Sequence, residues 1–534
     1  MGWWQSCLVL FLLSCSLSLT QAELYTALAD MEELLTTEVV LIRTLDQYIE
    51  AQEERLKMLK KFSNGFKMEH AEAAKDVSEY LSNPINAFLV VKRLTLDWKQ
   101  AENYMIDHIY KEAMDNMTRY KQDLKFPTDE DLSGAATALL RLQDTYKLDT
   151  SSVARGELNG VQYTTHLTAS DCFELGRQSY NTQDFYHTTL WMGEALARHE
   201  MERNGTNTAK WEILEYLAYS KFMQGQVKSA LHLTEELLMI FPNHQRAQGN
   251  KLYYQEELKK SPGKQDETLV NNVPTSLEPS EREKYEMLCR GDLTISPVVQ
   301  SQLKCRYVHR NVPYLRLMPL KEEEAHLQPR ILLYRDAMYD SEIDLIKKMA
   351  QPRLRRATVQ NYKTGELEIA HYRISKSAWL REPEHPVVER ISKRVEYMTG
   401  LTTSTAEELQ VVNYGIGGHY EPHYDFARPG EANAFKSLGT GNRVATVLFY
   451  MSDVAQGGAT VFTSLNLSLW PEKGTAAFWH NLHTSSDGDY YTRHAACPVL
   501  TGSKWVSNKW LHEAGQEFLR PCDPTEEISK QELS

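Results

Sequence analysis

The sequence predicts a multidomain protein with an all-α N-terminal half and a C-terminal half that forms a β-sandwich or jelly roll buttressed by helices. Three observations predict this fold class. Apolar residues recur at every seventh position near the N-terminus, a helical repeat occupies the middle, and short runs of β-branched and aromatic residues separated by turn signals begin near residue 285. The 534 residues suffice for three or four domains of about 150 residues each.

Composition and charge exclude several classes of protein. Apolar residues make up 42% and charged residues 25% of the chain, which excludes a collagen-like or wholly disordered protein. The formal net charge is -13 and no basic block is present, so a nucleic-acid partner is not expected. A cationic or neutral partner, or one bound by aromatic side chains, agrees better with this composition.

Residues 1–22 are typical of a secretory signal peptide. Residues 8–19 are apolar, and the small residues Thr20 and Ala22 precede a cleavage point between Ala22 and Glu23. The alternative is a membrane anchor, since the first residues include no Lys or Arg. That alternative is disfavoured because the apolar run is short and no other stretch of about 18 apolar residues follows.

Five cysteines remain after this cleavage, so one is left over in an oxidising compartment. The pairings Cys289–Cys305 and Cys497–Cys522 each close a short loop and are the expected disulfides. Cys172 is then expected to be free and buried.

Two further features concern the secretory route. Sequons at Asn116, Asn204 and Asn466 are expected N-glycosylation sites. The tail, residues 523–534, ends in Lys-Gln-Glu-Leu-Ser, which is not a retrieval signal for the endoplasmic reticulum. Either the protein is exported or a partner retains it.

Residues 23–150 are predicted to be helical, and residues 23–62 carry the seven-residue repeat. As a coiled-coil seam the repeat predicts self-association, which makes residues 23–150 a dimerisation domain. An amphipathic helix packed inside its own domain is an equally good interpretation, because the second series is broken by Glu38 and Gln52. The apolar positions are Leu28, Leu35, Ile42, Ile49 and Leu56 in the main series, with Met31, Leu45 and Leu59 in the second.

Residues 160–256 contain two units of a tetratricopeptide-type repeat. Corresponding positions Thr188 and Ala230 are 42 residues apart, so the usual period of about 34 residues carries an insertion. Tyrosines are frequent here, and Tyr216 and Tyr219 share a helix face. Aromatic grooves bind proline-rich peptides, whose polyproline II conformation is ordered before binding. Peptide binding is therefore favoured over a pure scaffold.

A polar linker, residues 257–284, separates these repeats from the β-rich domain, residues 285–522. Two helices are expected early in that domain, near residues 341–349 and 386–398. The expected strands include residues 331–334, 409–414, 443–450, 475–479 and 504–508.

A metal-binding pattern lies in the β-rich domain. His423 and Asp425 are separated by one residue, so on a strand both side chains point to the same face. A third ligand must come from elsewhere, and His494 is the best choice. Two histidines and one carboxylate on one face leave the opposite positions open, which is the non-haem Fe(II) arrangement for oxygen chemistry. A structural histidine beside a surface aspartate and a zinc hydrolase are the alternatives.

Lys504 strengthens the iron interpretation. It lies ten residues after His494 at the start of an expected strand. A buried lysine needs an anionic partner, and a dicarboxylate that chelates iron through one end would place its far carboxylate there.

With these residues the chain resembles the 2-oxoglutarate- and Fe(II)-dependent dioxygenases. More narrowly, it resembles the catalytic α subunits of the collagen prolyl 4-hydroxylases over essentially the whole chain after cleavage. The supporting stretches, besides His423-Tyr-Asp425, His494 and Lys504, are residues 352–358, 372–379, 439–443 and 505–510.

The resemblance implies a double-stranded β-helix catalytic domain behind a helical dimerisation region and a peptide-binding domain. It implies 4-hydroxylation of proline in X-Pro-Gly sequences of procollagen, with O2 and 2-oxoglutarate consumed and succinate and CO2 released. Ascorbate would restore the iron after uncoupled turnovers. The implied assembly is an α2β2 tetramer with protein disulfide isomerase, whose own retrieval signal would retain it in the endoplasmic reticulum lumen.

The resemblance also implies residue roles. His423, Asp425 and His494 would hold Fe(II), and Lys504 would bind the distal carboxylate of 2-oxoglutarate. Tyr414 is expected to hydrogen-bond the same carboxylate. His512 is expected either to orient the metal-binding end of 2-oxoglutarate or to have a structural role. The expected peptide-binding residues are Tyr180, Tyr216, Tyr219, Arg246 and Tyr253.

The chain departs from its relatives in the peptide-binding domain. Phe222 and Glu256 stand where relatives carry further groove aromatics. Phe222 lacks a hydroxyl and Glu256 adds a charge, so a peptide site with altered affinity is expected.

Two other functions compete with the hydroxylase. A chaperone-like binder of procollagen would use the repeat domain and keep an inactive catalytic fold, but the metal triad together with Lys504 argues against it. A secretory dioxygenase acting on lysine or on non-collagen proline is the other.

Overall fold

The computed structural model describes residues 23–523, except for residues 107–108, 164, 203–207, 261–265, 272–276, 361–366, 432–433 and 437. The chain forms two compact units. Asp30–Pro127 make one unit, and residues 23–29 together with the chain from Thr128 onward make the other. The predicted signal peptide, the Asn204 sequon and most of the predicted tail lie outside the described residues.

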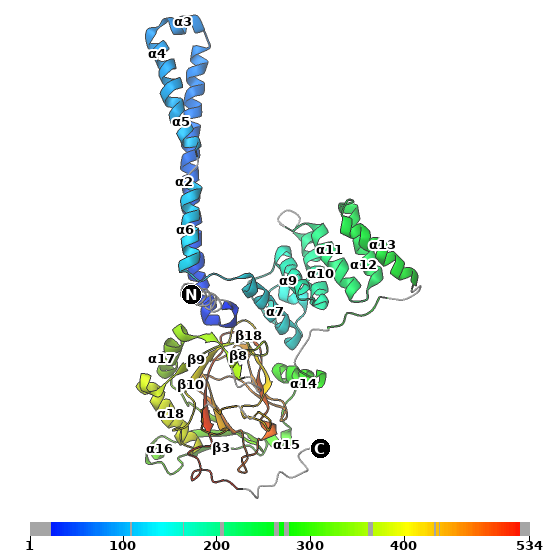
Figure 1. The fold of residues 1–534 in the computed structure, drawn as a ribbon, viewed down its shortest axis with the longest axis vertical. Helices are drawn as coiled ribbons and strands as arrows, with labels where there is room; N and C mark the ends of the chain where they lie inside the picture. The colour runs from blue at the N-terminus through cyan, green and yellow to red at the C-terminus, as the bar shows by residue number, and fades with distance from the viewer. Residues whose placement is uncertain are drawn as a thin grey trace, which may run out of the picture. The chain divides into compact units, whose positions relative to one another are not determined.

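Asp30–Pro127 form a long helical hairpin (Figure 1). The first arm is most of α2 (Leu28–Ala73), and the return arm ends in α5 (Trp98–Met105) and α6 (Ile109–Asp123). Stacking of Phe66 on Trp98, with ring centroids 4.9 Å apart, holds the arms together. The turn contains α3 (Val77–Ser82), α4 (Pro84–Lys92) and the π-helix Arg93–Asp97.

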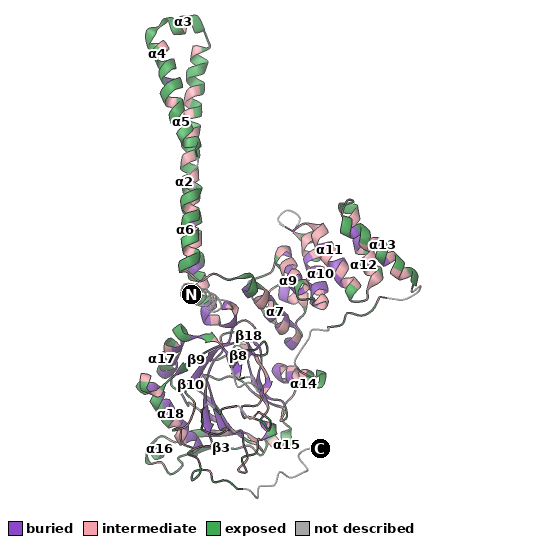
Figure 2. Cartoon of the chain, viewed as in Figure 1, coloured by how far each residue is buried: buried purple, intermediate pink, exposed green. Residues whose placement is uncertain are grey.

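The predicted coiled-coil seam is not covered by the hairpin's own return arm. Leu35, Ile42, Ile49 and Leu56 are all exposed, and Figure 2 shows much of α2 in the green of exposed residues. An amphipathic helix packed inside its own domain would bury these four side chains. The return arm therefore leaves these four apolar side chains uncovered.

The other unit opens with helices in the repeat region. A capping box between Thr128 and Asp131 starts α7 (Asp129–Tyr146), because the two side chains satisfy each other's free backbone amides. Antiparallel helices then follow, as the tetratricopeptide-type prediction requires (Figure 1). They are α9 (Ala169–Asn181), α10 (Phe185–Met201), α11 (Lys210–Met223), α12 (Val227–Ile240) and α13 (Gln245–Lys260), after the short α8 (Thr150–Ala154), β1 (Glu157–Leu158) and β2 (Val161–Gln162).

The structure divides the predicted domain 23–150. Residues 23–29 and α7 pack in the same unit as the repeats and the β-rich domain, while only Asp30–Pro127 form the separate hairpin. Helices also enter both ends of the predicted linker, because α13 continues to Lys260 and α14 (Pro279–Arg290) begins at Pro279.

Two facing sheets form the β-rich domain and confirm the predicted sandwich (Figure 1). In order, the nine-stranded sheet contains β3 (Cys305–Val308), β4 (Leu320–Leu327), β5 (Arg330–Arg335), β16 (Ala476–His480), β12 (Arg443–Tyr450), β19 (Trp505–His512), β10 (Leu409–Asn413), β9 (Lys376–Leu380) and β6 (Arg355–Arg356). The four-stranded sheet contains β11 (Tyr420–His423), β17 (His494–Ala496), β14 (Thr460–Phe462) and β15 (Leu467–Leu469). Smaller pairs are β13 (Gln456–Gly457) with β18 (Val499–Thr501) and β7 (Thr358–Gln360) with β8 (Leu367–Ile369).

The two predicted buttressing helices are α17 (Asp340–Ala350) and α18 (Pro386–Thr399). Their apolar faces pack on the larger sheet, where Ile343 and Val395 join Val411 and Phe449 in one buried cluster. The larger sheet is thus buried on both faces, one against helices and one against the smaller sheet. This placement leaves the space between the sheets for a site.

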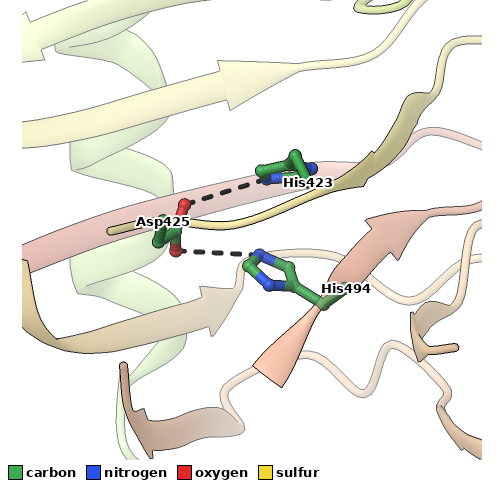
Figure 3. A group of neighbouring side chains, drawn as sticks. All are labelled: His423, Asp425 and His494. Carbon is green, nitrogen blue, oxygen red and sulfur yellow. Dashed lines mark ion pairs between the residues drawn. The ribbon is translucent and has the colours of Figure 1, made fainter. Parts of the chain in front are cut away.

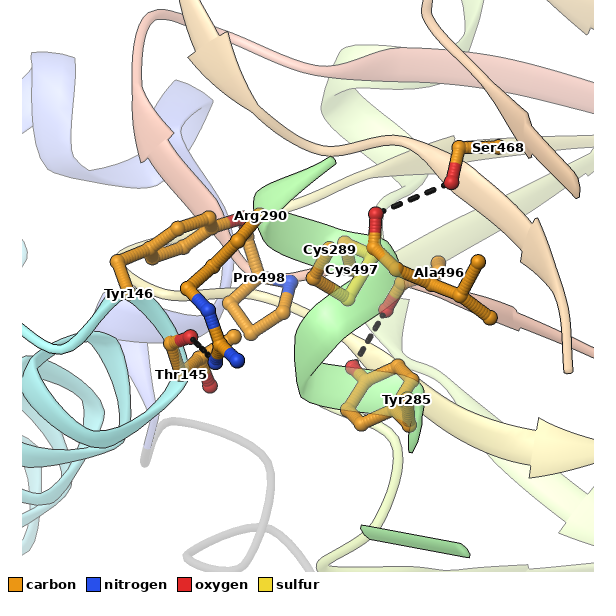
Figure 4. The surroundings of a disulfide bond; sticks show 10 residues. Thr145, Tyr146, Tyr285, Cys289, Arg290, Ser468, Ala496, Cys497 and Pro498 are labelled. Carbon is orange, nitrogen blue, oxygen red and sulfur yellow. Dashed lines mark hydrogen bonds between the residues drawn. A yellow bond between two sulfur atoms is a disulfide. The ribbon is translucent and has the colours of Figure 1, made fainter. Parts of the chain in front are cut away.

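The expected disulfide pairings are wrong. The structure joins Cys289 to Cys497, with Cα atoms 5.5 Å apart (Figure 4), and Cys305 and Cys522 are exposed thiols. Short loops favour pairing in the unfolded chain, but the fold packs α14 beside the end of β17 and brings together residues 208 apart in sequence. Cys172 is buried and unpaired as predicted, and burial raises the pKa of its thiol to about 12.

Two sequons lie in the described part of the chain. Asn116 is on α6, and Asn466 lies with positive φ in the turn between β14 and β15. Among the described helices, none combines the length and apolarity required for crossing a membrane.

Candidate active site

Three side chains that could hold a metal ion meet between the two sheets (Figure 3). The ligand atoms of His423, Asp425 and His494 all lie within 4.8 Å of one another. His423 Nε2 is 3.7 Å from Asp425 Oδ1, and His494 Nε2 is 3.6 Å from Asp425 Oδ2. The two histidines meet because β11 and β17 pair in a register that places them opposite each other. This pairing places two histidines that are 71 residues apart in the sequence on the same face of the four-stranded sheet.

Backbone carbonyls orient both imidazoles. Nδ1 of His423 lies 2.8 Å from the carbonyl oxygen of Glu421, and Nδ1 of His494 lies 2.9 Å from that of Thr492. A carbonyl oxygen only accepts, so each Nδ1 carries the proton and each Nε2 keeps a free lone pair toward Asp425. Burial lowers the pKa of His423 well below its ordinary value, and the neighbouring His494 lowers it further. Neutral imidazole is the form that binds metal.

Asp425 is held as a carboxylate. Its Oδ2 accepts hydrogen bonds from Thr446 Oγ1 at 2.8 Å and from Trp510 Nε1 at 3.0 Å. Burial alone raises the pKa of Asp425, but the two histidines and Arg443 outweigh this effect and lower it. Asn481 donates to Thr446 at 2.9 Å, so a chain of hydrogen bonds fixes the carboxylate before any metal binds.

Lys504 lines the same pocket as the three possible ligands. Its side chain is 1% exposed, and burial lowers the pKa of its ammonium to about 7. No carboxylate in the described part of the chain forms an ion pair with it. Its ammonium faces the ring of Tyr414, with Nζ 4.9 Å from the ring centroid.

The pocket that joins the metal cluster to Lys504 draws residues from both sheets. Tyr414 and Thr460 line it beside Lys504, and Tyr450 donates a hydrogen bond to Thr460 at 2.9 Å. Its apolar walls are Leu448, Trp479 and Val506. A dicarboxylate would therefore find a cation with hydroxyl groups at one end, the metal ligands at the other, and apolar walls between.

The structure does not place His512 in this pocket. His512 is fully buried, with Nδ1 2.8 Å from the Gly441 carbonyl and Nε2 3.0 Å from Glu407 Oε1. Both ring nitrogens thus have partners within the protein, and whether His512 also orients the metal-binding end of 2-oxoglutarate stays a prediction. Glu407 forms a two-pronged ion pair with Arg443, whose guanidinium lies 3.8 Å from the Trp510 ring.

A wider cavity of about 850 Å3 opens beside the metal cluster. Tyr420 stacks on His423 with ring centroids 3.5 Å apart, and the guanidinium of Arg373 lies 4.8 Å from the Tyr420 ring. Tyr372, Trp379 and Trp510 also line this cavity. It is long and aromatic, which suits an extended peptide that presents one residue to the metal.

The predicted peptide-binding residues lie on α9, α11 and α13. Tyr180 packs edge-on against Tyr216 and Tyr219, with centroids 4.9 and 5.8 Å away. Tyr253 is half exposed beside Phe222, and Arg246 reaches Glu215 at 2.7 Å. Aromatic faces thus continue from one helix to the next across the repeats. Phe222 also stacks on Tyr254, with ring centroids 4.7 Å apart. One face of the Phe222 ring is therefore occupied by a contact within the domain.

This two-sheet fold with a His-Asp-His cluster defines a class of oxygenase. The family model of the 2OG-Fe(II) oxygenase superfamily matches residues 409–512, which contain the cluster and Lys504. Models of the prolyl 4-hydroxylase α-subunit N-terminal region and of the prolyl 4-hydroxylase peptide-substrate-binding domain match residues 27–160 and 169–260.

The chain belongs to the prolyl 4-hydroxylase α-subunit family. It is 48% identical over 530 residues to prolyl 4-hydroxylase subunit alpha-2 of Caenorhabditis elegans, which covers 97% of each chain. It is 48% identical over 528 residues to subunit alpha-1 of Homo sapiens (95% of this chain, 97% of the relative) and 49% identical over 516 residues to subunit alpha-1 of Gallus gallus (94% and 99%). The predicted family and the predicted cofactors Fe(II) and 2-oxoglutarate are confirmed.

Sequence reasoning missed the residues that support the site from other strands. Thr446 and Trp510 donate hydrogen bonds to Asp425, Thr460 lines the same pocket as Lys504, and the guanidinium of Arg373 lies over the Tyr420 ring. Their spacing from the ligands carries no local signal. Side chains alternate between the two faces of a strand, so the position of Thr446 within the expected strand 443–450 could have indicated that its side chain points toward the site.

Proposed function

We propose that this chain is the catalytic subunit of a procollagen-proline 4-dioxygenase. It hydroxylates C4 of proline in X-Pro-Gly sequences and couples this step to the conversion of 2-oxoglutarate to succinate and CO2. One atom of O2 enters the proline hydroxyl and the other enters succinate. The observation that carries the proposal is the buried Lys504, which forms no ion pair with any described residue and lines the same pocket as His423, Asp425 and His494.

The residues present suit Fe(II). Two neutral imidazoles and one carboxylate on one side form the donor set of non-haem iron oxygenases and leave other positions free. His423, Asp425 and His494 would hold the ion, which supplies the activation of O2. The chain contributes a carboxylate that is already held in position, two oriented imidazoles and apolar walls that exclude water.

Lys504 suits the distal carboxylate of 2-oxoglutarate. An ammonium buried without a counter-ion is unfavourable until an anion arrives. Tyr414 and Thr460 would add hydrogen bonds to the same carboxylate. This geometry discriminates between a dicarboxylate and a monocarboxylate, because only a dicarboxylate spans from the metal ligands to Lys504.

The substrate is a proline-rich chain held in two places. Near the metal it lies in the cavity of Tyr420, Trp379 and Trp510, and on the repeats it binds the aromatic faces of Tyr180, Tyr216, Tyr219 and Tyr253 with Arg246. A polyproline II chain stacks prolines on such rings and has little conformational entropy to lose. Phe222 and Glu256 tune this affinity.

The assembly is an α2β2 tetramer in the endoplasmic reticulum lumen, with protein disulfide isomerase as the β subunit. The exposed seam of Leu35, Ile42, Ile49 and Leu56 supports self-association. The signal peptide directs the chain to the secretory route, the β subunit supplies retention, and the sequons agree with that compartment. Ascorbate returns the iron to Fe(II) after uncoupled turnovers, in which 2-oxoglutarate is consumed without hydroxylation of proline.

The test is direct. The purified holoenzyme is loaded anaerobically with Fe(II) and 2-oxoglutarate, exposed to O2 with a Pro-Pro-Gly peptide, and the peptide is analysed by mass spectrometry. A gain of one oxygen per modified proline is expected, lost in His423→Ala and retained in His70→Ala, an exposed histidine on α2. Peptide binding without oxygen gain would instead identify a non-catalytic procollagen binder.

A further inference from the structure

Residues 23–29, here called the N-terminal segment, are built into the catalytic unit. The segment comprises the 3-10 turn Leu24–Thr26 and the start of α2. Leu24, Thr26, Ala27 and Ala29 are each at most 4% exposed, which is a core environment rather than that of a frayed end. The part of the chain that precedes the hairpin is therefore a component of the catalytic unit.

The first contact of the segment is with the loop that follows β10. The backbone amide of Ile416 donates a hydrogen bond to the Tyr25 carbonyl at 3.1 Å. A Cβ added at Gly415 would lie 1.9 Å from that carbonyl oxygen and 2.7 Å from the Ala27 nitrogen, so glycine is required there by the segment itself. This loop joins Tyr414 at the pocket to β11, which carries His423.

The second contact leads to Lys504. The Ala29 amide donates to Asn413 Oδ1 at 3.1 Å, and Asn413 Nδ2 donates to the Lys504 carbonyl at 3.3 Å. The Tyr414 amide donates to the same carbonyl at 3.1 Å. Asn413 is fully buried, so both of its hydrogen bonds are protected from water. Two hydrogen bonds therefore connect the segment with the backbone of the lysine.

The third contact is electrostatic. Glu23 forms an ion pair with Arg356, whose Nη1 donates to the Arg373 carbonyl at 2.7 Å and to the Ser375 carbonyl at 3.3 Å. Arg373 lines the pocket. Without Glu23, the largely buried Arg356 would lose this partner, which is unfavourable for a buried charge.

Helix α7 holds the segment from the other side. The Tyr25 amide donates to Asp131 Oδ1 at 3.4 Å. A Cβ at Gly134 would lie 2.2 Å from the Tyr25 ring, so α7 and the ring are in close contact. The segment is thus fixed between α7 and the loop after β10, and it cannot withdraw without opening that wall.

We propose that the N-terminal segment is a positioning element for 2-oxoglutarate. By fixing Asn413, Gly415 and Ile416 from behind, it sets the positions of Tyr414 and Lys504, which receive the distal carboxylate. It makes no contact with the cofactor itself. This inference rests on the proposed role of Lys504.

The experiment measures the dissociation constant of 2-oxoglutarate by calorimetry on the full-length holoenzyme, with Mn(II) in place of Fe(II) so that no turnover occurs. The variants are Gly415→Ala, a deletion of residues 23–27, and the two combined. The matched control is Gly65→Ala, a helical glycine with no atom within 4 Å of an added Cβ. Affinity for a proline-rich peptide monitors the folding of the repeats.

The segment's role predicts non-additivity. Gly415→Ala and the deletion should each raise the dissociation constant about tenfold, the expected effect of losing one or two buried hydrogen bonds. The combined variant should equal the deletion alone, because the three atoms nearest to the added methyl group all belong to the deleted backbone. Gly65→Ala should leave the constant unchanged. If the deletion does not fold, Glu23→Gln against the exposed Glu32→Gln replaces it, with an increase expected only for Glu23→Gln.

Lys504→Met separates the two proposals. If Lys504→Met abolishes binding of 2-oxoglutarate while Gly415→Ala and Glu23→Gln stay within twofold of the unmodified protein, the segment is not a positioning element and the proposed function stands. If Lys504→Met binds 2-oxoglutarate normally, the role of Lys504 is wrong and this inference falls with it.

Discussion

The two ends of the pocket are built on opposite electrostatic principles. At the metal end, Asp425 is balanced by hydrogen bonds from Thr446 and Trp510, and the histidines are oriented by carbonyls. At the other end, Lys504 is buried without a carboxylate partner in the described part of the chain, and burial lowers its pKa to about 7. The metal end is thus preorganised, whereas the lysine end awaits an anion. Only the second end should cost stability in the absence of ligand.

Removing the metal end has the largest expected effect. Asp425→Ala leaves two imidazoles, which do not hold the ion against solvent. Loss of metal catalysis removes several kcal/mol of transition-state stabilisation, so turnover should fall at least about a thousandfold. Metal content after dialysis and the rate of oxygen transfer to a Pro-Pro-Gly peptide are the measurements. An active Asp425→Ala protein with its metal retained would show that the carboxylate is not a ligand.

Replacing Lys504 should weaken the binding of 2-oxoglutarate and stabilise the ligand-free fold. Lys504→Met should raise the dissociation constant of 2-oxoglutarate about a hundredfold, since a charged hydrogen bond of about 2–3 kcal/mol is lost. The ligand-free protein should gain about 1–4 kcal/mol of unfolding free energy, because an unpaired buried charge is replaced by an apolar chain. Calorimetry and chemical denaturation test the two parts.

The size of that stability gain depends on pH. The folded pKa of Lys504, about 7, lies below its ordinary value of 10.5, so the unfolded chain binds more protons between these values and stability rises with pH. The gain from Lys504→Met should therefore be greatest at or below pH 7 and shrink toward pH 10.5. A gain that is constant over this range would mean that the pKa of Lys504 is not lowered in the folded protein.

The hydrogen bonds behind Asp425 should matter less than its own carboxylate. Trp510→Phe removes the donor to Oδ2 but keeps an aromatic ring. Loss of such a supporting partner costs about tenfold or more in metal affinity. Metal titration compares this variant with Trp470→Phe, a half-exposed tryptophan that should have no effect. Equal metal affinity in both variants would show that Asp425 is oriented without Trp510.

The affinity for 2-oxoglutarate should depend on pH through Lys504. An incoming carboxylate requires the ammonium, whose protonated fraction falls above pH 7 in the ligand-free protein. Binding should therefore take up a proton and weaken about fivefold from pH 7 to pH 8. Calorimetry in buffers of different ionisation enthalpy detects that proton. A pH-independent affinity would contradict the lowered pKa.

The smallest effect on the pocket is expected at His512. His512→Asn loses a buried hydrogen bond to Glu407, so the unfolding free energy should fall by about 1–2 kcal/mol. The dissociation constant of 2-oxoglutarate should change by less than about threefold, since His512 does not line the pocket. A much larger loss of affinity would show that His512 takes part in binding 2-oxoglutarate.

The parts that the sequence predicted are those with local patterns. The spacing of His423 and Asp425 correctly predicted that the two side chains meet, although β11 ends at His423 and Asp425 lies just beyond it. The strand 443–450 is readable from its β-branched and aromatic residues. Contacts between distant positions were not predictable. Cys289 meets Cys497 across 208 residues, His512 meets Glu407 across 105, and Ala29 meets Asn413 across 384. Each depends on packing of whole elements, for which a single sequence carries no local signal.

The most direct test of the account is anaerobic equilibrium binding of 2-oxoglutarate, measured with and without Fe(II), in the unmodified protein, His494→Ala and Lys504→Met. The account predicts one 2-oxoglutarate per catalytic chain, with tight binding only when the metal, His494 and Lys504 are all present. Tight binding that survives the removal of Fe(II), or that is unaffected by Lys504→Met, would contradict a single pocket spanning both ends.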